Sequence, residues 1–210
     1  AWERWLAPGF LHLLVSRSGL GKSTLALRIA ACYLCGWAWP DGSPFAGEQG
    51  SVLGCESESA QALNVHRALD WQLPIKNVLT PLPNGADVNL CNATHRKAIE
   101  VAARRDDVRL VILDSLSGAR ASQDENSSRV LESTQWLAAL ARDTGKPVLA
   151  THHLRKRGLL DSDGDAVDLD RVRGSSAVVQ LARLVWAIDK PIEGDATLRL
   201  AVIKSNLGRF

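Results

Sequence analysis

The chain has 210 residues, and 25 Lys and Arg against 23 Asp and Glu give a formal net charge of only +2. This near balance excludes the broad basic field of a chromatin-type DNA-binding protein, so any contact with nucleic acid has to be local. No apolar run approaches the ~20 residues needed to cross a bilayer, and we expect no membrane partner. Hydrophobic residues make up 46% of the chain. Length and composition therefore predict a single domain, residues 1–210, and the lack of Met suggests a fragment of a longer protein.

Short apolar runs alternate with amphipathic segments along the whole chain. In order, we expect strands at residues 11–16, 51–55, 78–80, 109–113 and 147–151, and helices at 22–35, 56–69, 94–105, 127–143 and 175–181. This alternation predicts an α/β fold with a mainly parallel sheet sandwiched by helices. The last two strands, expected at 184–188 and 197–203, flank a turn with Pro and Gly, and so predict an antiparallel C-terminal hairpin at one edge.

The turn between the first strand and the first helix reads SRSGLGKS at residues 16–23, in the strand–turn–helix context that a phosphate-binding P-loop requires. Glycines let the backbone wrap closely around phosphate oxygens, and the start of the following helix adds free N–H groups. Lys22 can reach the β- and γ-phosphates of ATP. The expected nucleotide contacts are Ser18, Gly19, Leu20, Gly21, Lys22, Ser23 and Thr24. Ser16 replaces the first glycine of the usual pattern, at a position that enters the turn.

Two acidic residues come at the ends of expected strands. An Asp at a strand tip beside a P-loop holds Mg²⁺, and we expect Asp114 and the Ser23 hydroxyl to be the metal ligands. Glu56 is expected to polarise the attacking water as the catalytic base. Acidic residues also gather at helix starts, so Glu58 is interpreted as structural and stays the alternative base.

A His pair, His152 and His153, follows the strand expected at 147–151. A polar side chain there can sense the γ-phosphate of ATP and pass its loss to the following loop. His153 is the favoured sensor, with His152 as the alternative. A metal site is disfavoured because no third His or Cys lies nearby in the sequence.

Two further patterns are typical of metal sites but are better explained by residues that bind no metal. Cys32 and Cys35 form a C-x-x-C pair inside an expected helix, and no second pair exists. Buried helical thiols in a reducing cytoplasm are therefore favoured over zinc. Acidic residues recur at 161–170, but their spacing is wrong for a calcium loop, so they are interpreted as solvated charges.

Taken together, these segments resemble the RecA-type ATPases, and in particular the hexameric replicative helicases of plasmids and phages. The resemblance covers nearly the whole chain. It rests on WLAPG at 5–9, SRSGLGKST at 16–24, Glu56, VILDS at 111–115, THH at 151–153, RGSSA at 173–177 and KSNLG at 204–208. It implies a RecA-like P-loop NTPase core that uses ATP and Mg²⁺ in the cytoplasm, and a homo-oligomer in the form of a hexameric ring.

In such helicases a cation from the neighbouring subunit completes the ATP site, because it neutralises charge that develops on the transferred phosphoryl group. The resemblance implies that Arg183 is this catalytic cation, with Lys204 as the alternative. It also implies loops that bind single-stranded DNA, with candidates at 117–128 and 154–172. The second loop carries a basic run suited to DNA phosphates, namely Arg155, Lys156 and Arg157.

The function that the resemblance implies is an ATP-hydrolysing motor domain of a ring-forming replicative DNA helicase, translocating on single-stranded DNA. An oligomeric ATP-dependent switch or recombination regulator without unwinding activity would use the same nucleotide site and stays open as the alternative. A small-molecule kinase is disfavoured, because the sequence has no Arg-rich lid segment and no second substrate motif.

Overall fold

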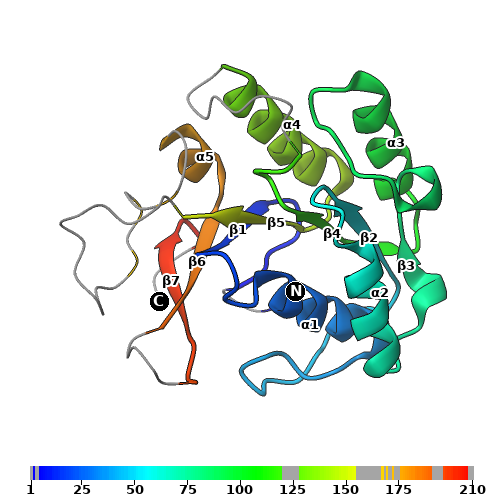
Figure 1. Ribbon diagram of the computed structural model, residues 1–210, viewed down its shortest axis with the longest axis vertical. Coiled ribbons are helices and arrows are strands. Elements are labelled where there is room, and N and C mark those ends of the chain that lie inside the picture. Colours follow the sequence, from blue (N-terminus) through cyan, green and yellow to red (C-terminus); the bar gives the residue numbers. More distant parts are fainter. Residues whose placement is uncertain are drawn as a thin grey trace.

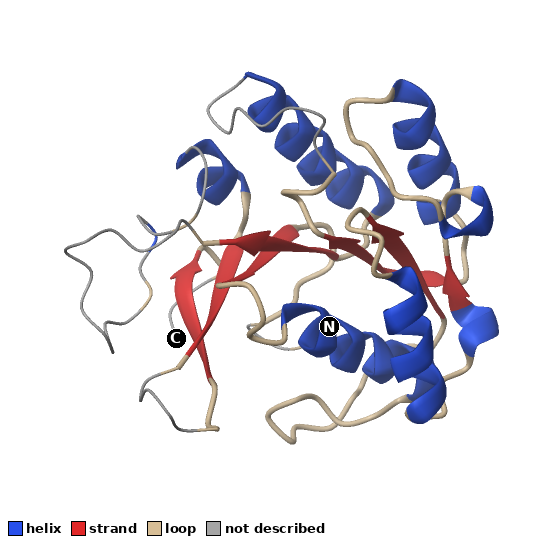
Figure 2. Cartoon of the chain, in the orientation of Figure 1, coloured by secondary structure: helices blue, strands red, loops and turns tan. Residues whose placement is uncertain are grey.

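The computed structural model of the protein describes residues 2, 5–119, 128–154, 167, 169, 172, 176–190 and 196–207. Within them a seven-stranded sheet has the order β3-β2-β4-β5-β1-β6-β7 (Figures 1 and 2). Its strands are β1 Leu11–Ser16, β2 Ser51–Glu56, β3 Val78–Leu79, β4 Val108–Asp114, β5 Val148–His153, β6 Leu184–Asp189 and β7 Arg199–Ser205. Neighbouring strands from β3 to β6 pair in parallel, whereas β6 and β7 are antiparallel. The predicted α/β fold with an antiparallel edge hairpin is confirmed.

Helices cover both faces of the sheet, with α1 and α2 on one face and α3, α4 and α5 on the other (Figure 1). Their bounds are α1 Lys22–Cys35, α2 Gln61–Asp70, α3 Ala93–Ala103, α4 Ser128–Thr144 and α5 Ser176–Leu181. Short 3₁₀ turns at Ile75–Asn77 and Pro83–Gly85 lie on either side of β3. Over the described ranges, no helix combines the length and apolar character that crossing a membrane would need.

Strand side chains alternate between two buried clusters, one on each face of the sheet. On β1, Leu13 and Val15 belong to the cluster under α3, α4 and α5, and Leu14 belongs to the cluster under α1. Central strands are therefore buried on both faces, which explains their continuous apolar runs in the sequence. Near the N-terminus, Trp2 closes the α1 cluster by stacking on Trp39, with ring centroids 5.3 Å apart.

Several element boundaries differ from the sequence prediction by one or more residues, and two of these differences affect the carboxyl end of the sheet. The helix expected at 56–69 begins only at Gln61, because β2 continues through Glu56 alongside β4. The strand expected at 147–151 continues through His153 alongside β1. Hydrogen bonding to a neighbouring strand extends both segments, and the local sequence pattern carries no record of that pairing.

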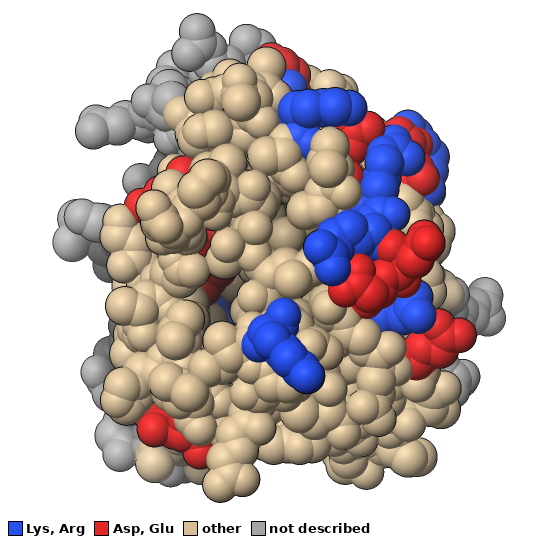
Figure 3. Space-filling view, turned by 90° about the vertical axis from the view of Figure 1, so that its right-hand side faces the viewer, with Lys and Arg blue, Asp and Glu red and all other residues tan. Residues whose placement is uncertain are grey.

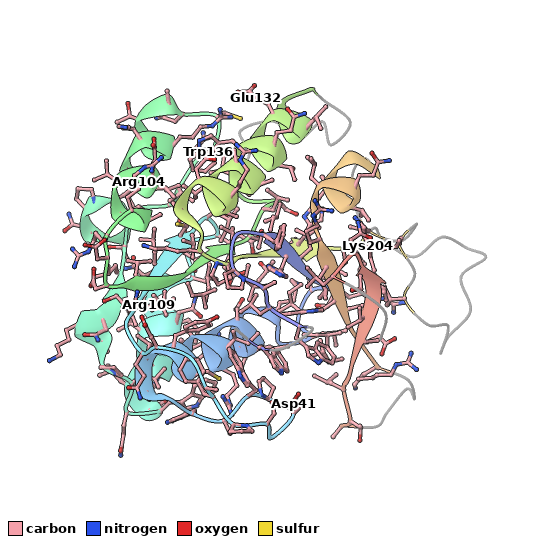
Figure 4. The ribbon with its side chains drawn as sticks, turned by 180° about the vertical axis from the view of Figure 1, so that it is seen from behind. Asp41, Arg104, Arg109, Glu132, Trp136 and Lys204 are labelled. Carbon is pink, nitrogen blue, oxygen red and sulfur yellow. The ribbon has the colours of Figure 1, made fainter. Side chains whose placement is uncertain are left out.

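Charged side chains on the face around α3 and β3 are mixed in sign (Figure 3). Arg104 contacts Glu100 at 3.0 Å on α3, and Arg109 of β4 contacts Glu48 at 2.8 Å. Figure 4 shows Arg104 and Arg109 from behind. Exposed pairs of this kind contribute little to stability. In the view of Figure 3 acidic groups interrupt the basic ones, which agrees with the small net charge of the chain.

Candidate active site

The carboxyl ends of β1, β2, β4 and β5 meet at one edge of the sheet, because these strands are parallel neighbours. Glu56 lies opposite Asp114 where β2 and β4 end, and Ser16 lies opposite His153 where β1 and β5 end. Residues that were selected one by one from the sequence are thus brought together from four strands. In open parallel sheets, this edge is where ligands bind.

The turn between β1 and α1 depends on its glycines. Gly19 and Gly21 have φ angles of 80° and 79°, in the left-handed region that side chains rarely adopt. Helix α1 begins at Lys22, and the residue before it, the N-cap Gly21, provides no side-chain cap. The first N–H groups of α1 are therefore available to an anion, and the helix dipole favours negative charge at this end.

Lys22 is buried, and its ammonium group lies inside this turn. Its Nζ donates to the carbonyl oxygen of Ser16 at 3.4 Å, to the Ser16 hydroxyl at 3.2 Å and to the carbonyl oxygen of Arg17 at 3.2 Å. Burial lowers the pKa of Lys22, and the charges of Asp114 and Glu58 oppose that change. Ser16, the departure from the usual motif, is fully buried and supplies two of the acceptors for Lys22.

Ser23 and Asp114, the expected magnesium ligands, line one cavity of about 240 Å³ together with Glu56. Asp114 Oδ1 accepts a hydrogen bond from the Thr151 hydroxyl, which orients the carboxylate. Within the described part of the chain, no group of three or more His, Cys, Asp or Glu is arranged to hold a metal ion. A hydroxyl and a carboxylate still fit Mg²⁺, because this ion takes only one or two protein oxygens when it also binds nucleotide phosphates.

A second cavity, of about 730 Å³, lies next to the start of α1. Its lining includes Gly21 and Thr24 of the P-loop region together with the aromatic side chains of Trp2, Trp5 and Trp71. No local pattern predicts this cavity, because its walls come from segments that are distant in sequence: the N-terminal segment, the start of α1, residues 40–41, Trp71 and the β6–β7 hairpin.

Glu56 has both carboxylate oxygens engaged. Its Oε1 accepts hydrogen bonds from the backbone N–H groups of Ser57 and Glu58, both at 3.1 Å, and its Oε2 accepts one from Asn64 Nδ2 at 2.9 Å. Burial raises the pKa of Glu56, and the nearby charge of Asp114 adds to the rise. Asn64 lies on α2, and the sequence analysis missed it because an Asn in an amphipathic helix carries no local signal.

Glu58 lies two residues after Glu56, and its side chain contacts different partners. Its Oε1 is 3.2 Å from His153 Nε2 and accepts a short hydrogen bond from the Ser115 hydroxyl. The hydrogen bond with His153, followed by that from Ser115, lowers the pKa of Glu58 to about 2. The pKa values of the two glutamates are thus shifted in opposite directions. The Glu56 carboxylate binds a proton more readily than usual, and the Glu58 carboxylate binds one less readily.

His152 and His153 lie on β5, and successive strand residues point to opposite faces. His153 faces the P-loop, where its Nδ1 is 3.5 Å from both Lys22 Nζ and Ser18 Oγ. Because Lys22 can only donate, its contact with Nδ1 fits the tautomer in which Nε2 carries the proton and donates to Glu58. His152 is fully buried, and its Nδ1 is 2.9 Å from the Ser117 hydroxyl.

Two serines join the ends of β2 and β4. The Ser57 hydroxyl donates to the carbonyl oxygen of Ser115 and accepts from the Ser115 N–H, both at 2.8 Å. Gly118 is needed beside them, because a Cβ at this position would lie 2.7 Å from Ser57 O and 2.8 Å from Glu58 Cγ. The sequence analysis missed this link, because serines in polar turns are common and their partner is distant in sequence.

Arg183 and Lys204, the two candidates for a cation acting on a neighbouring subunit, lie apart from this group. The Arg183 guanidinium is exposed and sits over the Phe10 ring, 5.3 Å from its centroid. Lys204 of β7 reaches the C-terminal end of α5, where Nζ donates to the carbonyl oxygens of Val179, Gln180 and Ala182 at 2.6–3.1 Å (Figure 4). Carbonyl groups at a helix end attract a cation, so Lys204 already has a structural role.

Several predicted residues lie outside the described part of the chain. They are the basic run Arg155, Lys156 and Arg157, the acidic residues at 161–170, residues 173–175 of the RGSSA segment, and Gly208. Most of the two candidate DNA loops, at 117–128 and 154–172, also lies outside the described residues.

A family model described as an AAA domain matches residues 1–158. No curated protein is similar to the chain in sequence. Among solved structures, the ATPase domain of G40P aligns with a TM-score of 0.69 and 15% identity, over 97% of this chain and 79% of that one. The RadB recombinase aligns with a TM-score of 0.63 and 14% identity, over 96% and 84%. Because the family model spans most of the chain and both structures share its fold, the protein belongs to the AAA domain family and is a P-loop ATPase of the RecA type.

Proposed function

We propose that the protein is the ATP-hydrolysing motor domain of a ring-forming replicative DNA helicase that translocates on single-stranded DNA. The observation that carries the proposal is the meeting of Lys22, Ser23, Glu56, Asp114 and His153 at one edge of the sheet. This set contains a phosphate-binding cation, two oxygen ligands for a metal, a carboxylate base and a polar group beside the P-loop. A phosphate-binding cation, a bound metal ion and a group that orients the attacking water are the parts that recur in enzymes that hydrolyse a phosphoanhydride.

In this proposal the N–H groups at the start of α1 and the ammonium of Lys22 bind the ATP phosphates. The larger cavity beside Gly21 and Thr24 receives the nucleoside, because its tryptophans offer apolar surface to a base. Ser23 and Asp114 would hold Mg²⁺, which neutralises phosphate charge when it is bound.

Glu56 is the proposed base that takes a proton from the attacking water. The contacts with backbone N–H groups and with Asn64 hold its carboxylate in one orientation. Its pKa is raised by burial, whereas that of Glu58 is lowered to about 2. Since a carboxylate with a higher pKa accepts a proton more readily, the two shifts favour Glu56 over Glu58.

Arg183 is the proposed cation that acts on the ATP of the neighbouring subunit. Its exposed guanidinium has no contact with the P-loop of its own chain among the described residues, so it is free to face another subunit. Lys204 is the weaker candidate, because three carbonyl groups already hold its ammonium. A cation supplied in this way would make hydrolysis depend on assembly of the ring.

DNA binding is proposed for the basic run Arg155, Lys156 and Arg157. This run follows β5 directly, and the last residue of β5, His153, contacts Lys22. Loss of the γ-phosphate would change the contacts of His153, and this change would therefore be passed to the start of the proposed DNA-binding segment. Similarity to the RadB recombinase supports action on DNA.

The test is the ATPase rate per subunit, measured over a series of protein concentrations with and without single-stranded DNA. We expect the rate to rise with concentration, because the site is shared between subunits, and to rise further with DNA. A strand-displacement assay on a forked duplex then measures unwinding. A rate that is independent of both concentration and DNA would contradict the motor function.

The similarity to the RadB recombinase supports a second candidate, an oligomeric ATP-dependent switch or recombination regulator without unwinding activity. A switch would use the same ATP site to assemble on its partner and would turn over slowly. Nucleotide-dependent assembly on DNA without strand displacement would favour this second function over the motor.

A further inference from the structure

The Glu58 carboxylate lies at the edge of the active site, but the proposed hydrolysis gives it no role. It contacts His153 Nε2 at 3.2 Å and the Ser115 hydroxyl, and its side chain remains 44% exposed. On its other ring nitrogen, His153 is 3.5 Å from Lys22 Nζ. Glu58, His153 and Lys22 therefore form a chain of contacts that ends at the phosphate-binding turn.

The backbone on both sides of Glu58 is fixed. Ser57 is held by the hydrogen bonds with Ser115. On the other side, the N–H and hydroxyl groups of Ser59 donate to the two carboxylate oxygens of Asp87, at 3.0 and 2.6 Å. With the backbone held on both sides, the side chain is the part of Glu58 that can change position, and Gly118 leaves room for its Cγ.

The donors around Glu58 are of the kind that bind phosphate. A hydroxyl and an imidazole N–H, close to a lysine ammonium, would bind a phosphate oxygen as readily as a carboxylate oxygen. The hydrogen bond with His153 and the charge of Lys22 both stabilise ionised Glu58, so its negative charge lies within the field of Lys22. An additional anion entering that field meets a like charge, and like charges close together repel.

We propose that Glu58 sets how strongly the site distinguishes a nucleoside triphosphate from a nucleoside diphosphate: its carboxylate holds His153 and Ser115 beside Lys22 and must yield to, or repel, an arriving γ-phosphate. The inference rests on the proposed ATP site and adds a specificity-determining residue to it. A diphosphate, which has no γ-phosphate, does not meet this charge.

The experiment compares wild type with Glu58→Gln, a substitution that keeps the shape and removes the charge. The dissociation constants of Mg²⁺ with ADP and of Mg²⁺ with a non-hydrolysable ATP analogue are measured by calorimetry. We expect Glu58→Gln to tighten binding of the analogue about five- to ten-fold, as loss of a like charge at a partly exposed site does, and to change ADP binding less than about two-fold.

Asp70→Asn is the control, since it removes one negative charge from the exposed end of α2, where the carboxylate contacts His66. It should leave the ratio of the two dissociation constants unchanged. An unchanged ratio in Glu58→Gln, or weaker binding of the analogue, would overturn the inference while leaving the ATP site intact. A wild-type chain that binds neither nucleotide would overturn the proposed function and this inference with it.

Discussion

Glu56 and Asp114 lie directly opposite each other at the last position of β2 and of β4. The parallel pairing of the two strands brings a carboxylate with a raised pKa next to the carboxylate that is suited to Mg²⁺. The charge of Asp114 adds to the rise in the pKa of Glu56, so the base and the metal ligand of the proposed reaction are electrostatically linked.

Replacement of Lys22 by Ala should weaken nucleotide binding at least about ten-fold, the effect expected for loss of a hydrogen bond to a charged group. The buried ammonium is the cation that lies inside the phosphate-binding turn. Calorimetric titration with ADP and Mg²⁺ measures the effect. Lys97→Ala, which removes an exposed ammonium from α3, is the control and should bind as the wild type does.

Replacement of Glu56 by Gln should reduce kcat about 10²- to 10⁴-fold, the usual contribution of a positioned base. The dissociation constant for ATP should change less than about three-fold, because the amide keeps the shape of the side chain. Single-turnover hydrolysis and analogue binding separate the two effects. Glu58→Gln serves as the comparison: if it abolishes hydrolysis and Glu56→Gln does not, Glu58 is the base.

A mixture of two inactive variants should regain activity if Arg183 acts on a neighbouring subunit. Arg183→Ala keeps a complete base but lacks the cation, and Glu56→Gln keeps the cation but lacks the base. In a mixed ring, a site with Glu56 from one variant and Arg183 from the other is complete. ATPase rates across mixing ratios should pass through a maximum. A rate that stays at the level of the separate variants would place Arg183 outside the shared site.

His12 should make the free energy of unfolding depend on pH. Its side chain is fully buried, with Nε2 accepting from the Ala7 N–H at 3.1 Å, and burial lowers its pKa from 6.5 to about 4. Between these values the unfolded chain binds the proton and the folded chain does not, so stability rises with pH. The contribution is present above pH 6.5 and is lost as pH falls toward 4, by about 3 kcal/mol.

Urea unfolding at pH 7, 5.5 and 4.5 measures this dependence. His12→Gln should remove that part of the pH dependence, whatever its effect on stability at pH 7. An equal slope in His12→Gln and wild type would assign the pH dependence to other groups.

The sequence by itself determined the order and type of the main elements and the nature of the phosphate-binding turn. Continuous apolar runs predict strands buried on both faces, and the positive φ angles of Gly19 and Gly21 are a local requirement that glycine meets. Asp114 could be selected because it ends an apolar strand downstream of a P-loop. These are properties of short segments, so they can be read without knowledge of the strand order.

Only the tertiary structure decided which partner each side chain at the sheet edge contacts. The register of β5 against β1 turned His153 toward Lys22 and buried His152 beside Ser117. Pairing with β4 extended β2 through Glu56, and a residue of α2, Asn64, then fixed the carboxylate. These contacts join residues of different strands and helices. Strand order and register bring such residues together, and no local sequence pattern encodes strand order or register.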